Sequence, residues 1–171
     1  MTVQTNIEIV GLKDALKNLN KLEPSLRRGI TKEYKEIVSP VIQEAKANIP
    51  KLPLSGWQYS WTTKSGFKML PWDPNKATKL VKAGVSGKKV KEFQGRNSNL
   101  AVFFIRWSGM VDTIFDMGRN GIMSRNLSAK WGKPSRVMWP AYEKHKNEVE
   151  GAVESLAFEA MRTADRLMKG K

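Results

Sequence analysis

The spacing of hydrophobic residues at the start of the chain predicts a strand followed by a helix. Residues 5–10, "TNIEIV", alternate between polar and apolar, so Ile7 and Ile9 would share one face of a half-buried strand. Gly11 would end this strand. Over residues 12–22, leucines recur every three or four positions, which is the spacing of one stripe on an amphipathic helix.

A second and longer helix is predicted over residues 24–49. Pro24 suits its first turn, and Pro50 ends it. Pro40 lies inside this helix, where it removes one backbone hydrogen bond and should kink the chain near Glu36. The apolar stripe of this helix consists of Leu26, Ile30, Tyr34, Ile37, Val38, Val41, Ile42, Ala45 and Ile49.

The middle of the chain contains most of the strand signals. Residues 50–77 are rich in proline, glycine, serine and aromatic side chains without a period, so they predict an irregular segment. Residues 78–94 predict a hairpin, and the β-branched and aromatic run at 99–107, "NLAVFFIRW", predicts a central strand. Residues 116–136 contain three glycines, a proline and five basic residues, which predicts a long loop. The hairpin would pair, across "SGKK", Leu80, Val81 and Val85 with Val90 and Phe93.

The end of the chain predicts one long helix over about residues 139–168. Pro140 fits its first turn. Phe158 and Met161 lie off the main apolar stripe, so this helix has a widened apolar face that could touch two neighbours, one of them another subunit. The main stripe consists of Val149, Val153, Leu156, Ala160, Ala164 and Leu167.

The order of these elements predicts an α+β fold. Strands cluster in the middle of the chain and helices lie at both ends, so we expect a small antiparallel sheet with helices packed on one face and a long C-terminal helix. A length of 171 residues predicts a single domain. Its segments would be residues 1–49 (a strand and two helices), 50–77 (the aromatic irregular segment), 78–115 (the sheet), 116–137 (the basic loop) and 138–169 (the C-terminal helix).

The charge of the chain adds a candidate partner. Lysine and arginine number 30 against 16 acidic residues, a formal net charge of +14. Such an excess indicates a polyanionic neighbour, either nucleic acid or an acidic protein surface. The same residues could equally form a solvated outer face or a set of salt bridges between subunits. The candidate contacts to DNA or to an acidic partner are Lys79, Lys82, Lys88, Lys89, Lys91, Arg96, Arg119 and Arg125.

Several kinds of chemistry are excluded or disfavoured by composition. The chain has no cysteine, which excludes disulfides, thiol catalysis and cysteine-based zinc sites, and its single histidine excludes a histidine-rich metal site. We therefore expect neither a cofactor nor a bound metal. The first residues lack the pattern of a signal peptide, and no run reaches the roughly 18 apolar residues of a membrane span. A reducing cytoplasm, or a particle assembled there, is the expected location.

The sequence offers two weak candidates for catalysis. His145 and Glu148 lie three apart on a predicted exposed helix face, where such a pair is normally a surface contact. Asp112 and Asp116 could bind a divalent ion as in a nuclease, but no further oxygen ligand is suitably spaced. The alternative for Asp116 is that it ends a strand or caps a turn before Gly118. We expect that the protein is not an enzyme.

Six tryptophans fall between positions 57 and 139, and most of them lie in predicted loops. Trp107 ends the apolar strand and is expected in the core. The loop tryptophans would fold back over the core, stack on a ligand, or pack into a partner, because a large apolar side chain is costly to leave in water. The candidate contacts to another subunit or partner are Trp57, Tyr59, Trp61, Trp72, Trp131, Phe158 and Met161.

Four stretches, taken in order, resemble a known family. "IEIVGLKDALKNLNKLEPSLRRGITKEYKEIVSPVIQEAKANIP" is followed by "LSGW", then by "VDTIFDMGRNG", and finally by "SRVMWPAYEKHKNEVEGAVESLAFEA". Together they span about half of the chain. They resemble the tail-completion or neck proteins of tailed bacteriophages, which are head–tail connector subunits of long-tailed phages. The tryptophan-rich middle departs from the shorter members of that family.

The resemblance implies a structural role and no reaction. It implies an α+β virion subunit that is assembled in the host cytoplasm and forms a ring, often a hexamer, at the head–tail junction. Its partners would be other copies of itself, the phage connector and tail-tube proteins, and the DNA that passes through the channel. The alternative function, on charge alone, is a basic nucleic-acid-binding module. Under the first hypothesis, the segment from Pro50 to Trp61 leads from helix to sheet, and its tryptophans pack against the core or the next subunit.

Overall fold

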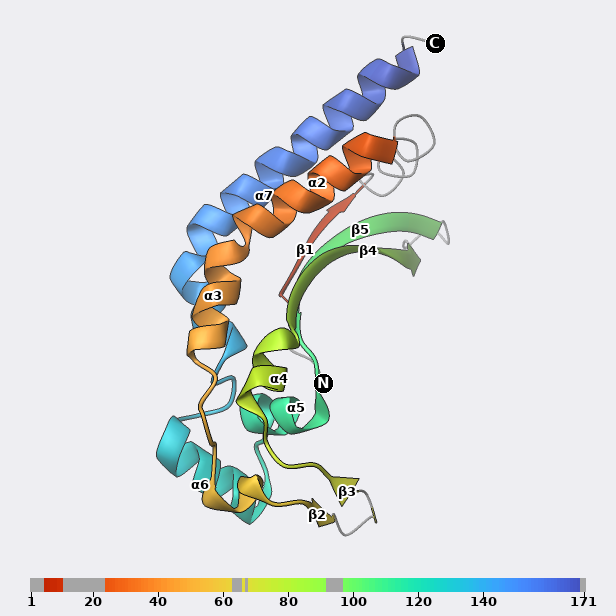
Figure 1. Ribbon diagram of the computed structural model, residues 1–171. Helices are drawn as coiled ribbons and strands as arrows, with labels where there is room; N and C mark the ends of the chain where they lie inside the picture. Colours follow the sequence, from red (N-terminus) through yellow and green to blue (C-terminus); the bar gives the residue numbers. More distant parts are fainter. Residues whose placement is uncertain (1–4, 11–23, 63–65, 67, 92–96, 170–171) are drawn as a thin grey trace. The chain divides into compact units, whose positions relative to one another are not determined.

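The computed structural model describes residues 5–10, 24–62, 66, 68–91 and 97–169 (Figure 1). The sequence predicts one domain over residues 1–171. In the structure, the chain divides into two compact units, and each unit is built from segments that are distant in sequence. The first unit contains Val41–Lys82 and Arg106–Lys144, and the second contains Thr5–Pro40, Ala83–Ile105 and His145–Lys171. The helix predicted over residues 12–22 lies outside the described residues.

A three-stranded sheet lies mostly in the second unit, with the strand order β1-β5-β4. Its strands are β1 (Thr5–Val10), β4 (Val81–Lys91) and β5 (Asn97–Trp107). Strands β1 and β5 are antiparallel, in a register that pairs Thr5 with Ile105 and Val10 with Leu100. Strands β4 and β5 are also antiparallel, because the five residues between them are too few for a parallel crossover. The predicted strands at 5–10 and 99–107 are confirmed.

The hairpin predicted within residues 78–94 is wrong. Strand β4 runs unbroken through "SGKK", so Val85 and Val90 lie on the same strand and do not face each other across a turn. The partner of β4 is β5, and the connection between them lies in residues 92–96, outside the described residues. Gly84 also favours this pairing, because a Cβ atom placed there would lie only 2.9 Å from the ring of Phe104 on β5. Long-range pairing therefore overrides the local serine–glycine turn signal.

Two helices cover one face of this sheet in the second unit (Figure 1). Helix α2 (Pro24–Ile37) places the buried ring of Tyr34 4.7 Å from the ring of Phe103 on β5. Burial raises the pKa of the Tyr34 hydroxyl well above its ordinary value. Helix α7 (Met138–Lys169) buries its predicted stripe of Val149, Val153, Leu156, Ala160 and Ala164, with Leu167 half-buried. The predicted α+β class, small antiparallel sheet and long C-terminal helix are thus confirmed.

The helix predicted over residues 24–49 is broken beside its internal proline, as expected. Helix α2 ends at Ile37, and helix α3 (Ser39–Ala47) begins one residue before Pro40. Proline has no N–H group, so the carbonyl of Glu36 receives no hydrogen bond from position 40. Val38 lies at the break and is fully buried, so the interruption occurs within the core and not at the surface.

The first unit is built from short elements around the start of α7. They are α3, a 3₁₀ turn η1 (Ser55–Gln58), the strand pair β2 (Trp61–Thr62) and β3 (Lys68–Met69), and helices α4 (Pro74–Lys79), α5 (Met110–Met117) and α6 (Gly121–Trp131). Asp73 caps α4 by accepting the backbone N–H groups of Asn75 and Lys76 at 2.9 and 3.1 Å. Two predictions are corrected here: residues 110–115 are helical and do not belong to the sheet, and residues 116–137 are mostly helix and not a loop.

The glycines misled the prediction for residues 116–137 because they lie at helix ends. Gly118 is the C-cap of α5, Gly121 begins α6 with a φ of 89°, and Gly132 is the C-cap of α6 with a φ of 82°. Positive φ angles favour glycine, which has no Cβ atom to clash. Between these ends, α6 buries Ser124 and Leu127, so tertiary packing stabilises a helix that has little pattern of its own.

An aromatic cluster forms the core of the first unit. Phe115 is buried, and its ring centroid lies within 6.5 Å of four indole rings, at 6.5, 5.8, 6.3 and 6.0 Å. The indole N–H groups of three of these residues donate to backbone carbonyls, at 3.1, 2.9 and 2.8 Å, so the polar edge of each ring is satisfied. The four tryptophans are Trp57, Trp72, Trp107 and Trp131. Trp72 donates to the carbonyl of Pro50, Trp107 to that of Ala77, and Trp131 to that of Pro53.

The aromatic cluster corrects the role predicted for two of the loop tryptophans. Trp57 and Trp72 are buried, so most of each indole ring packs inside the chain's own core and only a small part borders a surface cavity. Trp107 is in the core, as the sequence predicts. Of the three alternatives given for the loop tryptophans, folding back over the core is therefore the one that applies to Trp57 and Trp72.

Replacing Trp72 should separate the core role from a surface role. We expect Trp72→Ala to lower the free energy of unfolding by about 3–5 kcal/mol, because it removes a large buried ring and leaves a cavity. The matched control is Tyr59→Ala in the same segment, whose side chain is exposed and whose loss should cost less than about 0.5 kcal/mol. Urea unfolding followed by circular dichroism measures both, and equal losses would contradict this assignment of the core.

Candidate functional site

An apolar groove lies on the surface of the first unit. Its cavity volume is about 600 Å³, and it is lined by the segment around η1 and by the start of α6. Two large hydrophobic side chains on it are exposed to solvent, Tyr59 at 66% and Ile122 at 69%. The lining residues are Leu54, Ser55, Gly56, Trp57, Tyr59, Ser60, Trp61, Ile122, Met123 and Asn126.

The groove is held in place by the aromatic core beneath it. The N–H of Trp57 donates to Leu54 at 2.9 Å, and its carbonyl accepts the N–H of Trp72 at 2.8 Å. These bonds fix the backbone just before Tyr59, which faces solvent. On the other wall, α6 buries Leu127 while Ile122 stays exposed. The groove therefore borders the buried core and leaves apolar area in water, which is typical of a protein contact site.

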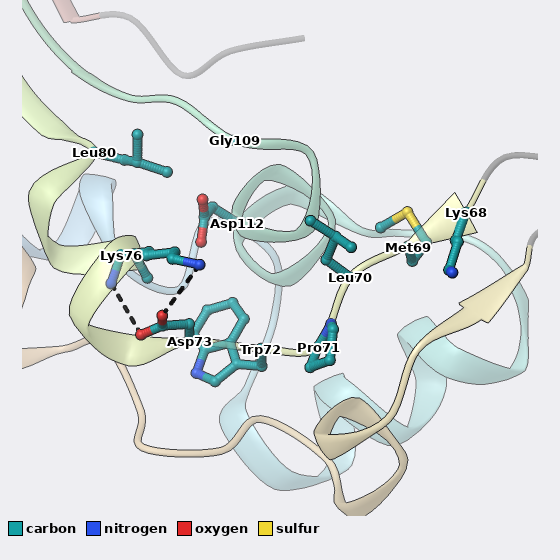
Figure 2. Close-up of a pocket in the computed structure, with 11 residues that line it drawn as sticks. Lys68, Met69, Leu70, Pro71, Trp72, Asp73, Lys76, Leu80, Gly109 and Asp112 are labelled. Carbon is teal, nitrogen blue, oxygen red and sulfur yellow. Dashed lines mark hydrogen bonds and ion pairs between the residues drawn. The ribbon is translucent and has the colours of Figure 1, made fainter.

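A second cavity, of about 330 Å³, contains a buried carboxylate (Figure 2). Asp112 lies in the first turn of α5 and is only 5% exposed. Its carboxylate folds back over Gly109, where any Cβ atom would lie 1.9 Å from Oδ2. The cavity is lined by Lys68, Met69, Leu70, Pro71, Trp72, Asp73, Lys76, Ala77, Leu80, Gly109 and Asp112.

Asp112 is poorly compensated for its burial. Burial raises the pKa of its carboxyl to about 6, and the opposing contribution comes from its own backbone N–H. Lys76 on the cavity wall makes its ion pair with Asp73, at 3.7 Å, and this pair is exposed to solvent. Among the described residues, the ion pairs do not include one to Asp112. When Asp112 is ionised, its negative charge thus lies among mainly apolar side chains without a fixed counter-ion.

Asp116 has a structural role that the sequence did not predict. It lies in α5, so it neither ends a strand nor caps a turn before Gly118. Its Oδ1 atom accepts the backbone N–H groups of Arg136 and Val137, both at 2.7 Å, immediately before α7 begins. Burial raises its pKa, while the N–H groups of Val137, Arg136 and Met138 oppose that rise. Asp116 therefore caps the start of the long helix from outside that helix.

Arg136 completes this network from the other side. Its guanidinium is buried and donates to the backbone carbonyls of Phe115, Asp116, Gly118 and Gly132 and to Oγ of Ser128. Burial lowers the pKa of Arg136, and the neighbouring Asp116 opposes that change. The ends of α5 and α6 are thus joined to the start of α7 by one side chain, which explains why a charged residue is kept inside the core.

The remaining predicted contact residues are dispersed. Trp61 is half-buried and lines the groove, while Trp131 is 37% exposed on the edge of the aromatic cluster. In the second unit, Phe158 of α7 is 51% exposed and Met161 is half-buried. Of the predicted partner contacts in the described part of the chain, the groove brings together Tyr59, Trp61 and the buried Trp57.

The basic residues predicted to contact DNA or an acidic partner lie on several elements. Lys79 ends α4, Lys82 is in β4, Arg119 follows α5 and Arg125 is on α6, and all four are exposed. The side chains of Lys88, Lys89 and Lys91, and the whole of Arg96, lie outside the described residues. Whether these residues contact a polyanion stays a prediction.

Sequence reasoning missed Ile122 and the Arg136 network. Ile122 lay in a predicted loop, where a single isoleucine carries no pattern, and it became a groove residue only when α6 formed. The buried role of Arg136 depends on carbonyls that come from residues 115–132, and no spacing in the sequence signals it. His145 lies half-buried on α7, and no interaction in the described structure gives it a catalytic partner.

The described part of the chain contains no group of three or more acidic or histidine side chains that could hold a metal ion. It also contains no helix with the length and apolarity that crossing a membrane requires. Comparisons with family models, with curated proteins and with solved structures find no match to this chain.

The capping role of Asp116 predicts a large loss of stability when its carboxylate is removed. We expect Asp116→Ala to lower the free energy of unfolding by about 2–4 kcal/mol, because two buried N–H groups lose their acceptor and Arg136 loses a nearby charge. Asp116→Asn keeps an acceptor oxygen and should recover part of that loss. Chemical unfolding of the two variants measures the difference, and equal stability of Asp116→Ala and the unchanged protein would contradict the capping role.

The raised pKa of Asp112 predicts that this carboxylate destabilises the fold at neutral pH. A folded pKa of about 6 lies above the unfolded value of about 4, so the folded state binds the proton more tightly. The cost is therefore absent below about pH 4, grows between pH 4 and 6, and is complete above pH 6. We expect Asp112→Asn to be more stable by about 1–3 kcal/mol at pH 7.5 and by almost nothing at pH 4. Urea unfolding at both pH values tests this, and a difference that does not change with pH would refute it.

Proposed function

We propose that this chain is a structural subunit of the head–tail interface of a long-tailed bacteriophage. Identical copies would form a ring that joins the connector to the tail tube around the DNA channel. The proposal combines the resemblance of the sequence to tail-completion or neck proteins with the α+β fold and its long C-terminal helix. In this role the protein catalyses no reaction, and its surfaces act by binding other subunits.

The observation that carries the proposal is the exposed apolar groove. Tyr59 and Ile122 are each about two-thirds exposed, and both line a groove that also includes the buried Trp57. Exposed apolar side chains that line one groove are favoured where a partner covers them, because assembly removes their apolar surface from water. We propose that a second copy of the chain covers this groove.

The positive charge of the chain fits the same role. With a net charge of +14, exposed side chains such as Lys79, Lys82, Arg119 and Arg125 would face acidic neighbouring proteins or the DNA in the channel. A strongly basic channel would hinder the passage of DNA, so we propose that much of this charge faces protein partners.

Assembly of the purified chain tests the proposal. We expect a discrete oligomer of identical copies by mass photometry and analytical ultracentrifugation. The double variant Tyr59→Ser/Ile122→Ser should weaken self-association by at least about tenfold, because two exposed apolar contacts worth about 1–2 kcal/mol each are lost. The fold should be unchanged, since neither side chain is buried in the isolated chain.

The matched control is the double variant Gln58→Ser/Ala129→Ser. Both residues are exposed on the same two elements, but neither lines the groove. It should assemble like the unchanged protein. A chain that remains monomeric at all concentrations would contradict the proposal. If that monomer also bound double-stranded DNA with a steep dependence on salt, the alternative of a nucleic-acid-binding module would replace it.

A further inference from the structure

The cavity that contains Asp112 has features that the groove and the aromatic core do not explain. Asp112 is only 5% exposed, and it lines a cavity of about 330 Å³. This volume falls within the range of about 300–1,000 Å³ found for binding pockets. An aspartate in the first turn of a helix would be stabilised by the helix dipole equally well at the surface, so helix formation alone does not require its burial.

The walls of this cavity are mainly apolar, and the acid lies among them (Figure 2). Met69, Leu70, Pro71, Trp72 and Leu80 line it, while the titratable groups that border it are Lys68 on β3 and Asp73 and Lys76 at the start of α4. Lys68 and Lys76 have exposed side chains, and Lys76 pairs with Asp73. The arrangement is thus a mainly apolar cavity with one buried carboxylate and with exposed charged side chains at its border.

We infer that this cavity binds the side chain of a lysine or arginine from another protein chain. The methylene groups of such a side chain would lie against Met69, Leu70 and Trp72, and its ammonium or guanidinium group would donate to the Asp112 carboxylate. The indole of Trp72 adds an aromatic surface that attracts cations. A neutral or anionic ligand would leave the buried charge without a counter-ion, so the chemistry of the cavity selects a cation.

The source that the charge balance favours is a second copy of this chain. The sequence carries 30 lysine and arginine residues against 16 acidic ones, so its surface is rich in the group that the cavity takes and poor in competing acids. This choice of source rests on the proposed assembly into a ring. The raised pKa of Asp112 supports the inference, because a bound cation would recover the cost of holding this carboxylate ionised at neutral pH.

Binding of small probes tests the cavity itself. Butylguanidinium carries the charged group on a short apolar stem, and butanol has a comparable stem without charge. We expect butylguanidinium to shift the Met69 methyl resonance in a saturable way at pH 7.5, with an affinity about tenfold lower for Asp112→Asn. Asp165→Asn, which removes the same charge from an exposed position on α7, should bind the probe like the unchanged protein. Equal shifts with butanol, or no effect of Asp112→Asn, would overturn the inference.

Self-association of the full chain tests the source. At pH 7.5 we expect Asp112→Asn to weaken the oligomer by about tenfold while Asp165→Asn does not. If the unchanged chain forms its oligomer and Asp112→Asn leaves it intact, the second copy is not the source, and the proposed ring still stands. If the unchanged chain stays monomeric while the probe binds through Asp112, the ring and the second copy both fall, and the cation-binding cavity stands.

Discussion

The burial of Phe115 among four indole rings is the constraint on which the first unit depends. Its ring contacts tryptophans from four separate segments, so these segments can be ordered only together. Because the indole N–H groups end on backbone carbonyls of Pro50, Ala77 and Pro53, the cluster also fixes the path of the chain between its helices. Three of the six aromatic residues predicted as partner contacts, Trp57, Trp72 and Trp131, are thus used for folding.

Helix α5 connects this core to the rest of the unit through two adjacent residues. Phe115 supplies the buried ring, and Asp116 supplies the carboxylate that accepts the N–H groups ahead of α7. Arg136, just before α7, also joins these helices, because its guanidinium donates to the carbonyl of Phe115 on α5 and to that of Gly132 at the end of α6. Buried charges are costly, but here the guanidinium nitrogens of Arg136 and the Oδ1 atom of Asp116 all have hydrogen-bond partners, so the network orders helix ends that the aromatic contacts alone would leave unsatisfied.

The two sites for which we propose binding, the apolar groove and the Asp112 cavity, lie outside this network. Tyr59 and Ile122 line the groove, and Asp112 lines the cavity, one helical turn away from the hydrogen-bonded Asp116. The two acids on α5 therefore differ in environment although they are the same residue type. Asp116 accepts two backbone N–H groups, whereas Asp112 is buried beside a cavity, which is the physical difference between the carboxylate with a structural role and the one for which we propose a ligand.

Local sequence features determined four elements. Hydrophobic periodicity predicted β1, α2 and the buried stripe of α7, the missing N–H of Pro40 predicted the interruption after α2, and a β-branched and aromatic run predicted β5. These features could not determine α5 and α6, which are short, bordered by glycines and stabilised by distant residues, nor that β4 passes through a serine–glycine signal to pair with β5. Composition indicated the tryptophans as unusual, and a spacing of four residues singled out Asp112 and Asp116. Only the tertiary structure decided which of them became core, cap or exposed surface, because burial is set by contacts between segments that lie far apart in the sequence.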